Sequence, residues 1–172
     1  LFRSLLEEFS KCYDKDLSFR RTYDSFIQHK KDERFDYTLI VNIKDSLLRK
    51  IYAMVYHSRG SKKTEKMREN ILTFIKENED WLPFYCVYKY FKQQFLQASW
   101  KEWERSLQHL TKEQILDVWN DPSLKEELYF YAWEQFIAFK QFKIAADYVK
   151  SLGITLKGDL PILLNEDSCD VW

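Results

Sequence analysis

The amino-acid sequence predicts a mostly α-helical segment that carries one β-strand near its end. Only three glycines and three prolines interrupt the 172 residues, which favours long helices with few tight turns. Apolar residues recur three and four positions apart along most of the chain, and this is the period of an amphipathic helix. Residues 153–157 differ, because apolar and polar side chains alternate there as they do in a strand.

The overall composition is that of a globular chain. Hydrophobic residues make up 45% and charged residues 31% of the sequence, which argues against disorder. The 27 basic residues balance the 27 acidic ones, so the chain has no general attraction to nucleic acid or to an anionic membrane. No apolar run reaches the roughly 18 residues of a membrane-spanning helix. The aromatic content of 17% has two interpretations, a bulky helical core or rings that contact carbohydrate.

The cysteines and histidines predict no metal site. Cys12, Cys86 and Cys169 are odd in number and far apart, unlike a disulfide framework or a paired zinc motif. A reducing, cytoplasmic location is therefore expected. None of the three histidines has a partner histidine three or four positions away, and the sequence contains neither a phosphate loop nor a nucleophile elbow.

Three helices are predicted before residue 59. Apolar positions over residues 1–12 and 16–31 recur at helical spacing. Asp36 is placed to cap a third helix, which ends near Ser58. Within it, residues 38–41 have the composition of a strand, which leaves a strand as the alternative at that point.

Two charged runs separate these helices from one another and from the next. Residues 30–34 are interpreted as a solvated joint. Residues 59–63 are interpreted as an exposed basic turn, with a phosphate or nucleic-acid site as the alternative. Thr64 is placed to cap the helix that follows. Asp80 is placed to cap another, with Pro83 in its first turn.

The next stretch holds a tryptophan pair and two capping boxes. Trp100 and Trp103 are interpreted either as a knob that packs a short helix or as a platform for a sugar ring. Thr111 opens a capping box and a short helix. Ser123 opens a second capping box and the longest helix, which is expected to run to about Leu152.

The longest helix carries apolar residues over a wide arc. So broad a surface implies that the helix makes contact on more than one side. Gly153 is expected to end it, because glycine readily adopts the left-handed conformation that closes many helices. The main apolar stripe comprises Leu128, Ala132, Phe136, Phe139, Phe142, Ala146 and Val149.

The end of the chain is acidic. Asp159 lies two residues beyond the predicted strand, and functional residues of βα architectures usually lie just beyond the carboxyl ends of strands. Pro161 stiffens the exit from the strand, since it lacks an N–H and fixes φ. Asp159 is interpreted either as a structural acceptor or as a substrate contact. Glu166, Asp167 and Asp170 follow on one short loop, and such residues rarely form the carboxylate pair about 5 Å apart that retaining glycoside chemistry needs.

The residues at the end of the chain, and the spacing between them, resemble a family signature. Residues 158–162 read GDLPI, and residues 167–172 read DSCDVW. Together they resemble the GDLPI…DSADVW signature of the 4-α-glucanotransferases of glycoside hydrolase family 77, also called amylomaltases or disproportionating enzymes. Cys169 stands where the family usually has alanine, and residues 163–165 also depart from the usual pattern. Neither change removes an acidic group.

This resemblance implies a fold and an activity for the parent protein. Members of the family are (β/α)8 TIM barrels with helical insertions, α/β overall. Residues 35–122 would then be a helical insertion, and residues 123–172 the long helix, one barrel strand and the active-site loop after it, with residues 1–34 unassigned. The family transfers α-1,4-glucan segments by a retaining double displacement and uses neither a metal nor an organic cofactor. The implied partners are maltooligosaccharides and the rest of the catalytic barrel.

The resemblance also implies site residues. Asp159 corresponds to the family aspartate on the floor of the donor subsite. Asp167, Ser168, Asp170 and Trp172 correspond to motif residues of the loop above it, without individual roles. The family's nucleophile and acid/base lie downstream of this motif, so both are expected beyond Trp172, in a parent protein longer than this chain, and the segment alone is expected to be inactive.

The alternative is a non-enzymatic helical interaction module. In that case the strand at residues 153–157 would be fortuitous. A lone parallel strand has no partner strand elsewhere in the sequence, which favours the barrel interpretation.

Overall fold

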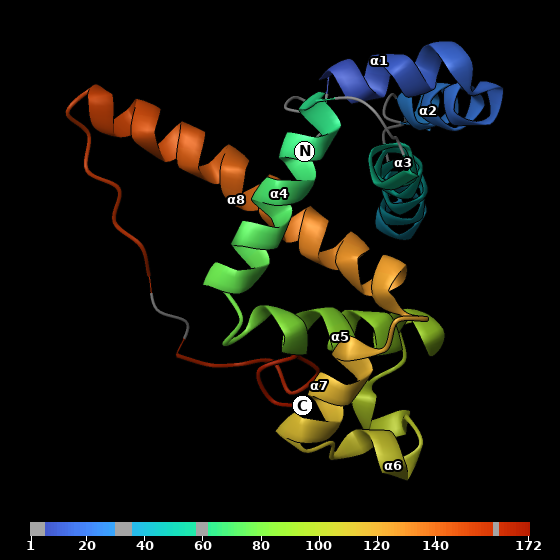
Figure 1. The fold of residues 1–172 in the computed structure, drawn as a ribbon, viewed down its shortest axis with the longest axis vertical. Helices are drawn as coiled ribbons and strands as arrows, with labels where there is room; N and C mark the ends of the chain where they lie inside the picture. Colours follow the sequence, from blue (N-terminus) through green and yellow to red (C-terminus); the bar gives the residue numbers. More distant parts are fainter. Residues whose placement is uncertain (1–5, 30–35, 58–61, 160–161) are drawn as a thin grey trace. The chain divides into compact units, whose positions relative to one another are not determined.

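The chain divides into two compact units, residues 1–69 and residues 70–172, with the boundary inside helix α4 (Lys62–Glu77). The described residues form helices and loops, without a β-strand (Figure 1). The mostly α-helical class predicted for this segment is therefore confirmed. The computed structural model describes residues 6–29, 36–57, 62–159 and 162–172.

The first unit contains three mutually packed helices and the first turns of α4. The three are α1 (Leu6–Lys15), α2 (Leu17–His29) and α3 (Tyr37–His57), and each packs against the other two. Phe9 of α1 meets two rings of α2 edge-on, Phe19 at 5.3 Å and Tyr23 at 4.7 Å between centroids. The three helices predicted for this part of the chain are confirmed.

Aspartates cap two of these helices. Asp16 Oδ1 accepts a hydrogen bond from the N–H of Phe19 at 3.0 Å, and Asp36 Oδ1 accepts one from the N–H of Leu39 at 2.9 Å. Both bonds satisfy first-turn amides that no helical carbonyl reaches. The predicted Asp36 cap is confirmed. Helix α3 runs through residues 38–41, so the strand alternative there is wrong.

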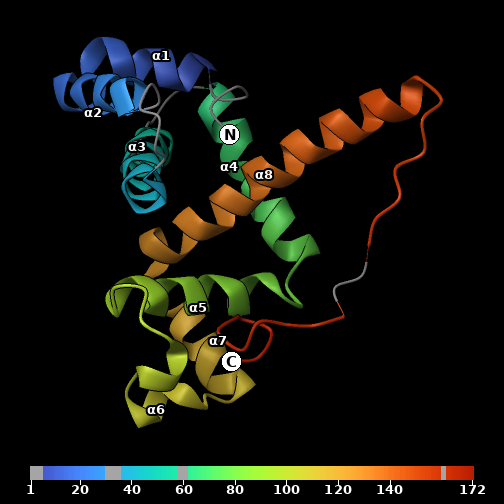
Figure 2. The same cartoon turned by 180° about the vertical axis from the view of Figure 1, so that it is seen from behind.

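The second unit is organised around α5. Helix α5 packs against both α7 and α8, and Figure 2 shows it lying between these two helices. The fully buried side chains of the second unit include Leu82 and Val87 on α5 and Leu128, Trp133 and Ile137 on α8. The elements are the end of α4, α5 (Leu82–Gln94), the 3₁₀ helix η2 (Trp100–Glu102), α6 (Arg105–Gln108), α7 (Lys112–Asn120) and α8 (Lys125–Ser151).

One of the predicted capping boxes is confirmed and the other is wrong. Thr111 accepts from the N–H of Gln114, and the Gln114 side chain accepts from the N–H of Thr111 at 2.8 Å. Ser123 caps nothing, because its hydroxyl donates to Asp121 Oδ1 at 2.7 Å, so the two residues close a turn before α8 begins at Lys125.

Two further predicted caps are also wrong. Thr64 lies inside α4, which begins at Lys62, so the last two residues of the predicted basic turn are helical. Asp80 is not needed as a cap, because the carbonyl oxygen of Asn78 accepts from the N–H of Leu82 at 2.9 Å. Pro83 does occupy the first turn of α5, as predicted. The predicted joint at 30–34 and the start of the basic turn at 59–61 lie outside the described residues.

The strand predicted at residues 153–157 does not form among the described residues of this chain, although the helix before it ends as expected. Gly153 has φ +76°, and its N–H donates to the carbonyl of Lys150 at 3.0 Å, which closes α8. Residues 154–159 then run without strand hydrogen bonds. A strand exists only through bonds to a neighbouring strand, and the described residues provide none.

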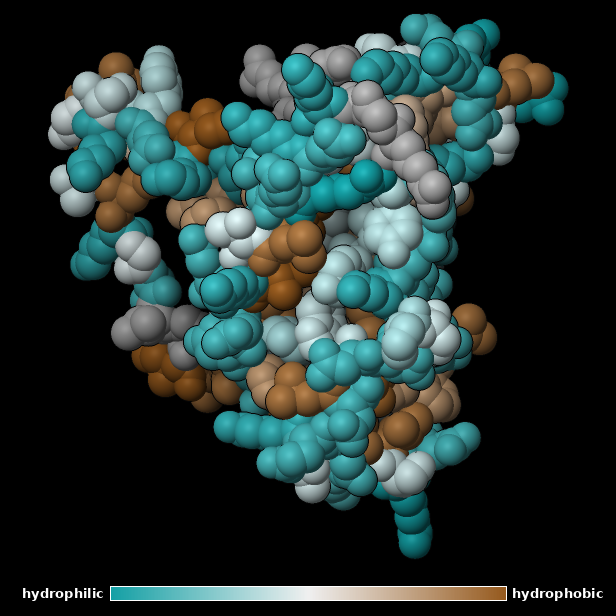
Figure 3. All heavy atoms as spheres, viewed as in Figure 1, coloured by the Kyte–Doolittle hydropathy of each residue, from teal (hydrophilic) through white to brown (hydrophobic). Residues whose placement is uncertain are grey.

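Helix α8 changes character along its length. Its first half buries most of its apolar side chains between Leu128 and Ile137, whereas its second half exposes Phe142 (67%) and Tyr148 (63%). Figure 3 shows hydrophobic spheres at the surface along this end of the helix and again near the end of the chain, where Ile162 and Leu163 are exposed. Within the described residues, no helix combines the length and apolar character needed to cross a bilayer.

Candidate functional site

The carboxylate of Asp167 attaches the end of the chain to the helices of the second unit. Its Oδ2 accepts from Lys92 Nζ at 2.7 Å. Its Oδ1 accepts from the Tyr88 hydroxyl and from the backbone N–H of Trp100, both at 3.2 Å. We call residues 165–172 the acidic loop. Because three donors surround one carboxylate, Asp167 is an anchor of this loop.

Lys92 serves two segments at once. The residue is only 9% exposed, and its ammonium also donates to the carbonyls of Gln97 at 3.0 Å and Ala98 at 2.9 Å. All three ammonium protons therefore have acceptors, which is what a buried cation requires. The carbonyls belong to a turn in which Leu96 and Gln97 both have positive φ, 50° and 68°. Lys92 thus holds a strained turn and the acidic loop together.

Two indole groups fix the rest of the acidic loop. Trp100 Nε1 donates to the carbonyl of Glu166 at 2.7 Å, and Trp172 Nε1 donates to the carbonyl of Leu107 at 2.8 Å. The Glu166 carboxylate also forms an exposed ion pair with Lys101. The loop is therefore held near both of its ends.

An aromatic cluster lies under the acidic loop. The Trp172 ring lies 5.6 Å from Tyr88 and 5.7 Å from Trp103, and Trp103 stacks on Phe95 at 5.6 Å. Trp103 is 3% and Trp100 9% exposed. The packing interpretation of the tryptophan pair is therefore confirmed, and neither ring is an open platform for a sugar.

The protonation states at the anchor follow from its contacts. Burial raises the pKa of Asp167, but the hydrogen bond from Lys92 and the one from the Trp100 N–H outweigh burial, so the pKa lies below its usual value. Burial and the Asp167 charge raise the pKa of Tyr88, which keeps its hydroxyl a donor. Burial and the nearby Asp170 raise the pKa of the Cys169 thiol to about 11, so this thiol is not an activated nucleophile.

Three of the predicted site residues line a groove beside this anchor. Ser168, Asp170 and Trp172 form one wall, and residues of α7 and of the start of α5 form the others. The cavity has a volume of about 630 Å³, within the range of about 300–1,000 Å³ typical of ligand sites. The groove and the anchored acidic loop together are the candidate site.

Asp159 is not part of this arrangement. Its side chain is exposed, and it has no hydrogen bond or ion pair within the described residues. Asp167, Ser168, Asp170 and Trp172 are brought together, whereas Asp159 lies on the extended segment before them.

Sequence reasoning missed Lys92 and Tyr88 as the partners of the acidic loop. A signal was present, because Lys92 follows Tyr88 by four positions on the apolar face of α5. A lysine within an apolar stripe needs an acidic partner. Nothing in the pattern indicates that this partner is Asp167, 75 residues away.

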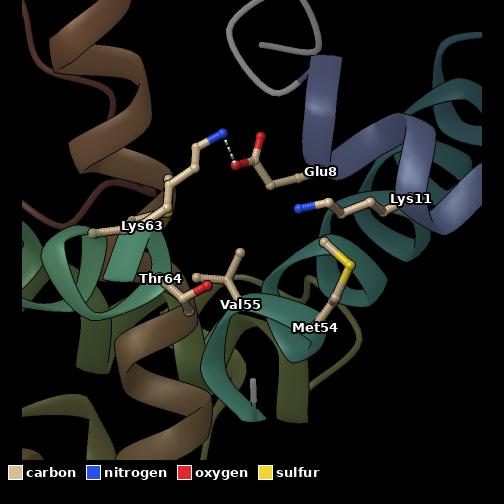
Figure 4. Close-up of a pocket in the computed structure, with 7 residues that line it drawn as sticks. Glu8, Lys11, Met54, Val55, Lys63 and Thr64 are labelled. Carbon is tan, nitrogen blue, oxygen red and sulfur yellow. Dashed lines mark ion pairs between the residues drawn. The ribbon is translucent and has the colours of Figure 1, made fainter. Parts of the chain in front are cut away.

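A second cavity lies in the first unit but is small. It has a volume of about 80 Å³, and Lys63 Nζ and Glu8 Oε1 form an ion pair beside it at 3.1 Å (Figure 4). Glu8 is 8% exposed, so the ion pair compensates for a buried carboxylate. Since the volume is far below that of ordinary ligand sites, the candidate site is assigned to the second unit.

Comparisons with known proteins identify the family. The glycoside hydrolase family 77 model, described as 4-alpha-glucanotransferase, matches residues 9–172. The chain belongs to this family. The stretch from Asp167 to Trp172 lies inside the match, and so does α5 with its Lys92.

Relatives named 4-alpha-glucanotransferase come from several bacteria. The protein of Clostridium butyricum is 32% identical over 140 residues, covering 81% of this chain and 27% of the relative. That of Aquifex aeolicus is 32% identical over 136 residues, covering 79% and 25%. That of Synechocystis is 28% identical over 139 residues, covering 81% and 26%. The chain thus spans about a quarter of the length of the relatives it matches.

Proposed function

We propose that the protein containing this chain is a 4-α-glucanotransferase that transfers α-1,4-glucan segments between maltooligosaccharides by a retaining double displacement. The observation that carries the proposal is the family match over residues 9–172, which includes the whole acidic loop. The substrates follow from the family, and the reaction proceeds without a metal or an organic cofactor.

The catalytic carboxylates lie beyond Trp172 in this proposal. A retaining mechanism needs a nucleophile and an acid/base about 5 Å apart on opposite sides of the sugar. Asp167 is already bound by Lys92, Tyr88 and the Trp100 N–H, which suits an anchor and not a nucleophile. The segment alone is therefore inactive.

Asp159 is assigned to the floor of the donor subsite. Its exposure, together with the lack of partners among the residues that the structure describes, leaves its carboxylate available to a substrate or to neighbouring parts of the parent protein. Asp167 is assigned to holding the acidic loop in place above it, and Ser168, Asp170 and Trp172 to the surface that the loop presents.

The parent protein is proposed to be a (β/α)8 barrel of the α/β class. Residues 35–122 form its helical insertion, and residues 123–172 contribute the long helix, a barrel strand and the loop after it. The uncovered apolar half of α8 supports this, because the rest of the barrel would bury it. The alternating pattern of 153–157 would become a strand once neighbouring strands are present.

A cytoplasmic location is proposed with this function. The free thiols Cys12, Cys86 and Cys169 are consistent with a reducing compartment.

The test is glucose release from maltotriose by the full-length protein. Asp159→Asn keeps the shape but removes the charge, and we expect kcat/KM to fall about tenfold or more. Asp147→Asn, an exposed aspartate of α8, is the matched control and should keep full activity. Unchanged activity of Asp159→Asn removes this residue from the site. A folded full-length protein without any glucose release favours the interaction-module alternative.

A further inference from the structure

We propose that residues 88–107 position the acidic loop for the transfer reaction of the parent protein, and that Lys92 is the central positioning residue. This role rests on the proposed function, since the acidic loop belongs to the proposed active site. It gives the helical insertion of residues 35–122 a direct part in the reaction.

The chain ahead of the acidic loop gives the loop little support among the residues that the structure describes. Residues 154–159 run without strand hydrogen bonds, and Ile162 and Leu163 are 93% and 90% exposed. Inside the loop, Asn165 Oδ1 accepts from the N–H of Asp167 at 2.9 Å, which shapes a local turn. The position of the loop is therefore set by the helices on which it packs.

The contacts between the loop and the helices come from residues 88–107. They include the three donors to Asp167, the indole bond of Trp100 and the carbonyl that accepts from the Trp172 indole. The Trp172 ring also meets Phe91 at 6.0 Å between centroids. Since the loop is tied near both of its ends to one short segment of the helical insertion, that segment determines where the loop lies.

Lys92 is central because it fixes the segment as well as the loop. Its ammonium donates to the carbonyls of Gln97 and Ala98, in a turn with two positive φ angles. Backbone strain of this kind persists only where the surrounding structure holds it. The turn leads to the Trp100 N–H, which is another donor to the Asp167 carboxylate. Removal of Lys92 therefore weakens two donors to the same carboxylate, one directly and one through the turn.

The position of the loop matters because the residues assigned to its surface follow the anchor directly. Ser168, Asp170 and Trp172 all lie just after Asp167 in the sequence. A misplacement of about 1 Å can lower the rate of an enzyme about a hundredfold. Lys92 is 9% exposed and its three protons are bound within the protein, so it acts through the loop and not by touching a substrate.

The experiment compares Lys92→Met with Lys89→Met in the full-length protein. Lys89 is a half-buried lysine of the same helix without a hydrogen bond or ion pair among the described residues, so Lys89→Met should keep the natural kcat/KM for maltotriose. Lys92→Met should lower kcat/KM about tenfold or more. The indole N–H resonance of Trp172 should move in the same sample, because the loop is displaced. Asp167→Asn should show both effects, and it replaces Lys92→Met if that variant does not fold.

The pH profile separates positioning from a purely structural role. Burial raises the pKa of Asp167, and the hydrogen bonds from Lys92 and from the Trp100 N–H more than offset burial. In Lys92→Met the pKa of Asp167 therefore rises, and the acid limb of kcat/KM should move to higher pH. The double variant Lys92→Met/Asp167→Asn should lack this movement, because the titrating carboxyl is gone.

The other titratable groups near this carboxyl do not produce the same movement. Burial and neighbouring negative charge raise the pKa values of Tyr88 and Cys169, so both stay neutral at acidic pH. The carboxylate of Glu166 is paired with Lys101, which both variants leave in place. A movement that depends on Asp167 is therefore specific to the Lys92 contact.

Turnover by the natural full-length protein separates this role from the proposed function. If the natural protein releases no glucose from maltotriose, the proposed function is wrong and the positioning role falls with it. If the natural protein is active and Lys92→Met is as active as Lys89→Met, the positioning role is wrong and the enzyme proposal stands. The same conclusion follows if the Trp172 resonance moves without a loss of kcat/KM, or if the acid limb moves equally with and without Asp167.

Discussion

The ammonium of Lys92 connects α5 to two segments that are separate in the sequence. Its bond to Asp167 spans 75 residues, and its bonds to the carbonyls of Gln97 and Ala98 close the turn after its own helix. A single side chain therefore contributes both to the turn after α5 and to the attachment of the acidic loop. The exposed ion pair of Lys101 with Glu166 lies on the same loop but is open to water.

Lys92→Met is expected to destabilise the chain by about 2 kcal/mol. The Asp167 carboxylate then loses its cation, and two carbonyls lose a donor. The cost stays below that of a fully buried pair, because the Asp167 side chain is 36% exposed and water reaches it. Urea unfolding followed by tryptophan fluorescence measures the change. Lys101→Met is the matched control and should leave the unfolding midpoint in place. Equal midpoints for the two variants would show that Lys92 is no anchor.

The same contact predicts how the acidic loop responds to acid. The folded-state pKa of Asp167 is lower than its unfolded value of about 3.9, so ionised Asp167 stabilises the fold at every pH above that value. This contribution is lost as the pH falls through the folded-state pKa. We expect the indole N–H resonances of Trp100 and Trp172 to keep their positions from pH 7 to about pH 4 and to move below it.

Asp167→Asn is the check on this assignment. The variant should be less stable than the natural chain at pH 7, and the difference should shrink as the pH falls below about 4. A stability difference that is the same at pH 7 and pH 3 would mean that the carboxylate charge plays no part in holding the loop.

At the scale of elements, the turn between α5 and η2 stores backbone strain. Leu96 has φ 50° and an 89% exposed side chain, so it occupies the left-handed region without packing in return. Leu96→Gly should therefore stabilise the chain by about 0.5–1 kcal/mol, because glycine adopts this conformation without a Cβ penalty. Thermal unfolding measures it. Gln93→Gly, three residues earlier inside α5, should instead destabilise by about 1 kcal/mol. If the Leu96→Gly chain is less stable than the natural one, the claim that Leu96 holds backbone strain is wrong.

The helices could be predicted from the sequence and their caps only in part. Apolar periodicity is local, so α3 and α8 were found close to their true bounds. A cap depends on which of several nearby groups reaches an amide first. At the start of α5, the carbonyl of Asn78 and not the side chain of Asp80 accepts from the N–H of Leu82. In the turn that precedes α8, the hydroxyl of Ser123 donates to Asp121 and therefore does not cap the helix.

The strand and the site contacts could not be predicted in the same way. The alternating pattern of residues 153–157 indicates which side chains a strand would bury. The segment forms no strand hydrogen bonds, however, without neighbouring strands. The motif of the acidic loop indicated its residues, yet the roles of Asp167 and Trp172 depend on Lys92, Tyr88 and the carbonyl of Leu107. These partners are far away in the sequence, and local patterns carry no information about them.

At the scale of the whole molecule, the second unit has a well-packed part around α5 and a part that leaves apolar side chains exposed. Around α5 the apolar side chains are buried and Lys92 is paired with Asp167, whereas the second half of α8 exposes Phe139, Phe142 and Ile144. Large apolar side chains exposed on one half of a helix suit an interface. In the barrel proposal, the remainder of the parent protein covers it.

Phe142→Ser tests this on two chains. In residues 1–172 alone, Phe142 is 67% exposed, so the substitution should change the free energy of unfolding by no more than about 0.5 kcal/mol. In the full-length protein the same substitution should cost about 2 kcal/mol, because a buried aromatic ring would be removed from its contacts. Urea unfolding of both chains gives the comparison. Lys140→Ser, an exposed residue one half-turn earlier on α8, should be neutral in both. If Phe142→Ser is as harmless in the full-length protein as in the segment, then nothing packs on this face of α8. The proposal that the barrel buries this half of the helix would then be wrong.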